Sequence, residues 1–319
     1  AITGVAPILL DTPGGLQGER GIGRAVVAYD VINQRVHYTY DDGLWSPAIS
    51  IAESVPFTKP DAVYQNGKIA VSWSDPQDGV SYATRQQIDG TSGTMFSHYD
   101  WVSETAVPDA ELGANEFFGP KVALALDAGG HPQIAFTRTL DLNINGRSTR
   151  DVQVWRKFGQ LGWSQAHRRD FPSTPGGVDN LTTGLDLTTH LNGDPVLVYE
   201  RDHGTDSDAV ISRPLGAPWI VEQAPLLDHH WTWAPALATG LNDDLHLVSS
   251  YSTFPTEPVE YFTKLTTITP SGTSDVAIPN PAFGETTAAN AITITPDGIA
   301  HIVGIRGNGG GVSTGELFY

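Results

Sequence analysis

The segment 226–237, with the sequence LLDHHWTWAPAL, gathers residue types that can act on sugars. His229 and His230 stand directly before Trp231 and Trp233. Histidine exchanges protons near neutral pH, so either imidazole could serve as a general base or acid. An indole offers an apolar platform to the face of a sugar ring. The same tryptophans could instead pack between structural elements, so the segment alone leaves both a site and a core open.

Six eight-residue segments with apolar centres recur along the chain and align without gaps. Their sequences are GRAVVAYD, GKIAVSWS, HPQIAFTR, DPVLVYER, DLHLVSSY and IAHIVGIR, and their last residues are Asp30, Ser74, Arg138, Arg201, Tyr251 and Arg306. Arginine fills three places of this last column, although the chain has only 18 Lys and Arg residues. Because a guanidinium binds a carboxylate through two parallel hydrogen bonds, the column predicts a pocket for a uronic or sialic acid. The alternative is that each arginine pairs with a neighbouring acidic residue.

The spacing of these segments indicates the fold. Successive segments end 43 to 64 residues apart, counting from the last through the C-terminus to the first, and units of this size with about four strands are typical of propeller blades. Five of the six follow a turn signal, namely YQNG, LDAGG, HLNG, GLNDD or TPDG, which predicts a hairpin. We therefore expect an all-β fold, a single β-propeller domain over residues 1–319. Six four-stranded blades fit best, and seven are the alternative.

The two ends of the chain are expected to close this ring. The last repeat runs out at GELFY, in its third strand. The N-terminal ITGVAPILL can supply the missing fourth strand, which would leave no open sheet edge. In that arrangement the innermost strand of the first blade must come from the glycine-rich TPGGLQGERGIG.

The repeats also resemble those of a known group. ALDAGGHPQIAFTR and ITITPDGIAHIVGIR resemble the repeats of sialidase-like, BNR-type propellers. This resemblance implies a carbohydrate ligand, because the group includes polysaccharide lyases, sialidases and sugar-binding propellers. The Ser-x-Asp-x-Gly-x-x-Trp signature of true sialidases is not intact anywhere in the sequence, so the resemblance does not choose among these activities.

One face of the propeller should carry the site. In an antiparallel hairpin the end of the second strand lies beside the start of the first. The last column of the repeats should therefore share a face with the loops that lead into the first strands. The substrate-binding candidates on this face are Arg306, Trp231, Trp233, Glu116, Phe117 and Arg20.

The chemistry that suits this set best is β-elimination from a uronic acid. Arg138 or Arg201 would neutralise the C5 carboxylate, and His229 or His230 would take the C5 proton. Tyr251, or the second histidine, would protonate the leaving oxygen. A lectin would repeat one residue type in most blades, whereas this column varies and favours a single central site. A sialidase-like hydrolase, with two carboxylates or with Tyr251 and a glutamate partner, is the other alternative.

The composition of the chain narrows the classes of molecule that it could bind. The net charge is −18 and the pI about 4.7, so the surface should repel nucleic acids and anionic membranes. The sequence has no cysteine and no run of about 20 apolar residues, which excludes thiol chemistry and a membrane-spanning helix. We expect a monomer that acts on an acidic polysaccharide or oligosaccharide.

No cofactor is required by these residues. The acidic loop DHGTDSD, at residues 202–208, has oxygens at spacings that could hold Ca²⁺, but it lacks the EF-hand pattern, and a plain surface loop is the simpler interpretation.

The first residues, AITGV, resemble a processed N-terminus, so we expect a secreted or periplasmic protein.

Overall fold

The computed structural model describes most of the chain. It covers residues 2–9, 24–41, 44, 46–56, 58–65, 68–76, 78–88, 98–141, 147–159, 161–171, 184–202, 207–214, 219–223, 231–252, 261–278, 285–295, 298–308 and 316–318. Within these ranges the secondary structure is antiparallel β-sheet, with one short 3₁₀ turn at Asp109–Glu111. The described ranges contain no helix long and apolar enough to cross a membrane.

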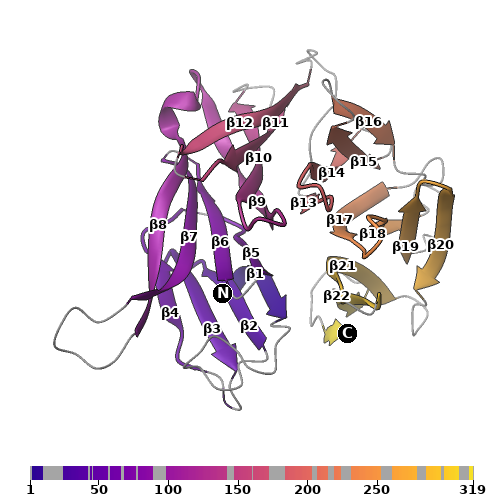
Figure 1. Cartoon of the computed structure of the whole chain (residues 1–319), viewed down its shortest axis with the longest axis horizontal. Helices are drawn as coiled ribbons and strands as arrows, with labels where there is room; N and C mark the ends of the chain where they lie inside the picture. Colours follow the sequence, from indigo (N-terminus) through magenta and orange to yellow (C-terminus); the bar gives the residue numbers. More distant parts are fainter. Residues whose placement is uncertain are drawn as a thin grey trace. The chain divides into compact units, whose positions relative to one another are not determined.

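The strands form six sheets, each built from consecutive strands of the chain (Figure 1). Sheet 1 has β1 (Ile2–Leu9), β2 (Arg24–Asp30), β3 (Arg35–Asp41) and β4 (Ile49–Ala52). Sheet 2 has β5 (Asp61–Gln65), β6 (Lys68–Asp75), β7 (Gly79–Ile88) and β8 (His98–Pro108). Sheet 3 has β9 (Glu116–Leu126), β10 (Pro132–Asp141), β11 (Arg147–Lys157) and β12 (Trp163–Asp170).

The second half of the chain repeats this plan. Sheet 4 has β13 (Leu185–Thr189), β14 (Pro195–Asp202), β15 (Ser207–Pro214) and β16 (Trp219–Gln223). Sheet 5 has β17 (Trp231–Thr239), β18 (Leu245–Ser252), β19 (Tyr261–Thr269) and β20 (Gly272–Ile278). Sheet 6 has β21 (Glu285–Ile294), β22 (Ala300–Asn308) and β23 (Glu316–Phe318).

The chain divides into two compact units. Unit 1 comprises Ala1–Leu126, Gly130–Asp141 and Gln153–Arg168, and it holds sheets 1 to 3 except for the start of β11 and the last two residues of β12. Unit 2 comprises Asp127–Gly129, Leu142–Val152 and Arg169–Tyr319, and it holds sheets 4 to 6.

Every repeated segment of the sequence forms the second strand of its sheet, as predicted. These strands are β2, β6, β10, β14, β18 and β22. Four of the hairpin turns that lead into them share one conformation, because the fourth turn residue has a positive φ. These residues are Gly130 (φ 75°), Gly193 (φ 86°), Asp243 (φ 67°) and Gly298 (φ 84°). Three of the four are glycines because this left-handed region carries no penalty without a Cβ.

The prediction for the N-terminal strand was wrong. β1 pairs with β2, from Ile2 opposite Asp30 to Leu9 opposite Arg24, so the N-terminus starts sheet 1 instead of completing sheet 6. In the described part of sheet 6 the order is β21, β22 and β23. The physical reason is strand propensity: the segment ITGVAPIL has β-branched residues, whereas a glycine-rich segment forms strands poorly.

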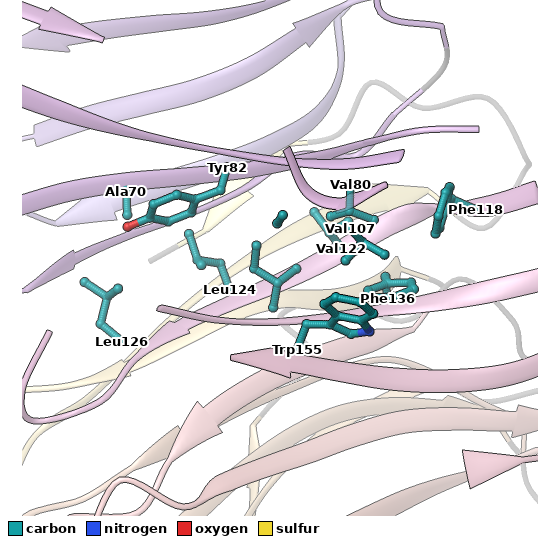
Figure 2. Close-up of a cluster of buried hydrophobic side chains, with 12 residues drawn as sticks. Ala70, Val80, Tyr82, Val107, Phe118, Val122, Leu124, Leu126, Phe136 and Trp155 are labelled. Atoms are coloured by element: carbon teal, nitrogen blue, oxygen red, sulfur yellow. The ribbon is translucent and has the colours of Figure 1, made fainter. Parts of the chain in front are cut away.

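One of the buried apolar clusters of unit 1 joins sheets 2 and 3 (Figure 2). Sheet 2 contributes Ala70, Val80, Tyr82, Ala106 and Val107, and sheet 3 contributes Phe118, Val122, Leu124, Leu126, Ile134, Phe136 and Trp155. The rings of Phe118 and Phe136 meet edge to face, with centroids 5.5 Å apart. In unit 2 a similar cluster joins sheets 4 and 5 through Val196, Val198, Ala209, Ile211, Leu237, Leu245 and Leu247.

Gly119 permits a close approach between β9 and β10. A Cβ on this residue would lie 2.0 Å from Thr137 Oγ1, at the point where the β9–β10 register shifts. We expect Gly119→Ala to lower the free energy of unfolding in urea by about 1–3 kcal/mol, since a buried clash forces the backbone to move. The double variant G119A/T137A removes the clashing oxygen and should recover part of this loss. An unchanged stability of G119A would contradict the packing described here.

Candidate functional site

Neighbouring first strands lie parallel and in register in unit 2. Asp186 Oδ2 of β13 accepts a hydrogen bond from Leu237 N of β17 at 2.7 Å, and the Oγ1 atoms of Thr188 and Thr239 are 3.1 Å apart. In both contacts the two residues are 51 positions apart in the sequence. Because this offset is constant, the two strands run in the same direction. The β13–β14 and β17–β18 hairpins therefore end at the same edge of unit 2.

Sheet 6 continues this arrangement. Ala236 and Val248, a cross-strand pair of sheet 5, pack against Ile292 and Ile302, a cross-strand pair of sheet 6. Because sheet 6 repeats the hairpin of sheet 5 and β21 contacts both β17 and β18, we infer that β21 and β22 run as β17 and β18 do. One edge of unit 2 then holds the ends of β14, β18 and β22 and the starts of β17 and β21.

The backbone brings five of the predicted site residues to this edge. Arg201 and Tyr251 lie at the ends of β14 and β18, with Trp231 and Trp233 at the start of β17 and Arg306 near the end of β22. Trp231 is paired with Ser252, and Tyr251 with Thr232. His229, His230 and Arg20 lie outside the described residues, so their places stay predictions.

The arginines of the last column have acidic neighbours along the backbone. Arg201 is paired with Asp208 of β15, and Arg306 with Glu316 of β23. In antiparallel sheets opposite charges at such positions attract one another. This register is compatible with the second interpretation of the arginine column, in which each guanidinium has an acidic partner, and it leaves the first interpretation open for Arg201 and Arg306.

For Arg138 the acidic partner is visible. Its Nη1 lies 3.5 Å from Glu116 Oε2, and the two side chains are only 5% and 1% exposed. Arg138 Nη1 also donates to the carbonyl of Glu111 at 2.7 Å, and Glu116 Oε2 accepts from Gly113 N at 2.8 Å. Glu116 and Arg138 are thus brought together as a buried ion pair of unit 1, with half-buried Phe117 next to them in β9.

Sequence reasoning missed a pair of aspartates that join neighbouring first strands. Asp61 of β5 accepts from Ala62 N at 2.8 Å and from Leu124 N of β9 at 2.7 Å. Asp186 does the same in unit 2, with Leu187 N at 2.9 Å and Leu237 N at 2.7 Å. The signal that could have found them is an acidic residue inside an otherwise apolar first strand, in DAVYQ and LDLTT.

Metal binding finds no support among the residues that the structure covers, since these contain no group of three or more His, Asp or Glu side chains suited to an ion. Residues 203–206 of the acidic loop lie outside the described residues. The calcium site there stays a prediction.

Comparison with known proteins gives the fold. No protein-family model and no curated protein matches this sequence. Among solved structures, a triple arginine-to-alanine mutant of AofleA from Arthrobotrys oligospora is 10% identical, with a TM-score of 0.55 over 100% of this chain and 86% of its own. An ulvan lyase of polysaccharide lyase family PL25, bound to GlcA(1-4)Rha3S, is 12% identical, with a TM-score of 0.51 over 99% of this chain and 93% of its own. A second structure of a PL25 ulvan lyase has a TM-score of 0.52. The predicted resemblance to propeller proteins that include a polysaccharide lyase is confirmed at the level of the fold.

The ion pair of Arg138 should matter for stability. Glu116→Ala leaves a buried guanidinium without its carboxylate, so we expect the free energy of unfolding to fall by about 3–5 kcal/mol. The double variant R138M/E116L removes both charges and should lose less. A loss below about 0.5 kcal/mol for E116A in urea unfolding would show that the pair does not hold β9 and β10 together.

Asp61 should give the stability a distinct pH dependence. Burial of its carboxylate raises the pKa of Asp61, against the hydrogen bonds from Leu124 and Ala62 and the charge of Lys121, which lower it. A raised pKa means that folding favours the protonated form, so this contribution to stability is present at low pH and is lost as the pH rises.

The measurement compares wild type with D61N. The difference in unfolding free energy, wild type minus D61N, should fall as the pH rises above about 4, the ordinary pKa of an aspartate. The exposed Asp78→Asn serves as the control for removing one negative charge from an acidic chain. A difference that rises with pH would mean that the hydrogen bonds outweigh burial.

Proposed function

We propose that this chain is a carbohydrate-active propeller that cleaves a uronic-acid-containing glycan by β-elimination. The observation that carries the proposal is the shared fold, over 99% of the chain, with an ulvan lyase bound to a glucuronate-containing unit. We further propose that the six sheets are the blades of one domain over residues 1–319, and that the protein acts as a secreted or periplasmic monomer.

The reaction needs three groups. A base takes the proton from C5, a double bond forms between C4 and C5, and the C4–O bond breaks while an acid protonates the leaving oxygen. The negative charge that develops on the C5 carboxylate in this step must be neutralised by a cation. In this proposal His229 or His230 is the base, Tyr251 is the acid and Arg201 is the cation.

The positions in unit 2 support these roles. Tyr251 and Arg201 end neighbouring second strands, and Trp231 and Trp233 begin the strand that pairs with Tyr251. His230 directly precedes this strand. Arg201 is preferred to Arg138, because Glu116 already neutralises the buried Arg138. Arg306 would contact a further sugar unit, and Phe117 and Arg20 of unit 1 stay candidates for sugar binding.

The test is absorbance at about 235 nm during incubation with ulvan and other uronate polysaccharides, because only elimination forms the unsaturated product. We expect H229A/H230A and Y251F each to lower kcat by about 10²- to 10⁴-fold, and R201M to abolish turnover. The control is His131→Ala, an exposed residue of the β9–β10 turn. New reducing ends without absorbance would indicate a hydrolase, and binding without cleavage a lectin-like propeller. Unchanged elimination by H229A/H230A would refute the assigned base.

A further inference from the structure

Two lysines of unit 1 lie side by side on neighbouring first strands. Lys59, just before β5, forms a parallel bridge with Lys121 of β9, and Lys59 N donates to Pro120 O at 2.7 Å. Thr58 is fully buried, and its Oγ1 also donates to Pro120 O at 3.3 Å, which fixes this register. Residues paired across neighbouring strands direct their side chains to the same face. Both ammonium groups therefore belong to one local surface.

These two charges are incompletely neutralised. Within the described part of the chain neither lysine has a carboxylate within ion-pair distance, although the protein has 36 acidic residues against 18 basic ones. Burial, together with the charge of Lys121, lowers the pKa of Lys59. Two like charges that are half-buried together raise the free energy of the folded protein.

Asp61 does not balance the pair. Its charge acts on Lys121, but both of its carboxylate oxygens already accept backbone N–H groups, from Ala62 and from Leu124. Even when Asp61 is ionised, one carboxylate against two ammonium groups leaves a net positive charge. An anion that enters from solvent would supply the missing negative charge and two acceptors.

We propose that Lys59 and Lys121 form a binding site for an oxyanion, namely a carboxylate or sulfate group. Lysine binds such groups as a point charge with three donors, so two adjacent lysines can share one tetrahedral or planar anion. The site lies in unit 1 and uses none of the residues proposed for elimination. It therefore stands or falls independently of the lyase proposal.

The probes are inorganic sulfate, sodium glucuronate and a sulfated, uronate-containing oligosaccharide, each titrated by calorimetry at low ionic strength. We expect saturable binding to the wild-type protein and at least a tenfold weaker Kd in K59M and in K121M. K68M is the matched control, because Lys68 is an exposed lysine of the same unit; it should bind as wild type does. The conservative K59R/K121R should retain binding.

A second measurement separates a ligand site from two solvated lysines. Without anion, K59M and K121M should melt at a higher temperature than wild type at low ionic strength, because each removes the repulsion. Sulfate at low concentration should then stabilise wild type and K68M but neither methionine variant, which distinguishes binding from the general effect of sulfate on proteins.

The outcomes decide the source of the anion. Binding of inorganic sulfate or glucuronate as tight as that of the oligosaccharide identifies a free-ion site, and much tighter binding of the oligosaccharide identifies a glycan subsite. Equal binding of all probes by wild type, K59M and K121M would overturn the proposal, as would no binding at all.

Discussion

The way in which neighbouring sheets are joined within each unit depends on one constraint, the open edge of each first strand. A first strand pairs with its own sheet along one edge only, and the backbone groups of the other edge must find partners elsewhere. Asp61 and Asp186 solve this problem in the same way, because each carboxylate takes an N–H of its own strand and one of the neighbouring first strand. These contacts fix a parallel register, and the register determines which second-strand ends share an edge.

The second strands could be predicted from sequence because each is paired along both edges and several are buried on both faces. In β14 the residues from Val196 to Tyr199 are all fully buried, which produces the continuous apolar run that the repeats display. The outer strands carry no such signal: six of the seven residues of β20 are exposed. The N-terminal strand was misplaced for a related reason, since an apolar pattern identifies a strand without saying which neighbour it joins.

Candidate site residues could be chosen from the sequence by type, but their pairing could not be predicted. Arg138 was chosen because it stands in the last column of the aligned repeats. Its contact with Glu116 lies across β9 and β10, where the register shifts, and the sequence does not show that shift. No sequence pattern relates Lys59 to Lys121, because they become neighbours only through the contact between two first strands of different sheets. Long-range pairing of this kind leaves no local pattern, so it can be read only from the structure.

The arginines of the last column lie opposite or beside acidic residues of different strands. All three arginines have an acidic residue nearby, but from different strands: Glu116 of the first strand in sheet 3, and Asp208 and Glu316 of the third strand in sheets 4 and 6. Sheet 5 departs from this rule, because its column residue is Tyr251, opposite Thr232. The buried ion pair with Glu116 explains Arg138, but no such pair explains a tyrosine next to tryptophans and histidines. The proposed elimination site is therefore built around the β17–β18 hairpin, and Arg201 is its proposed cation because β14 ends at the same edge of unit 2.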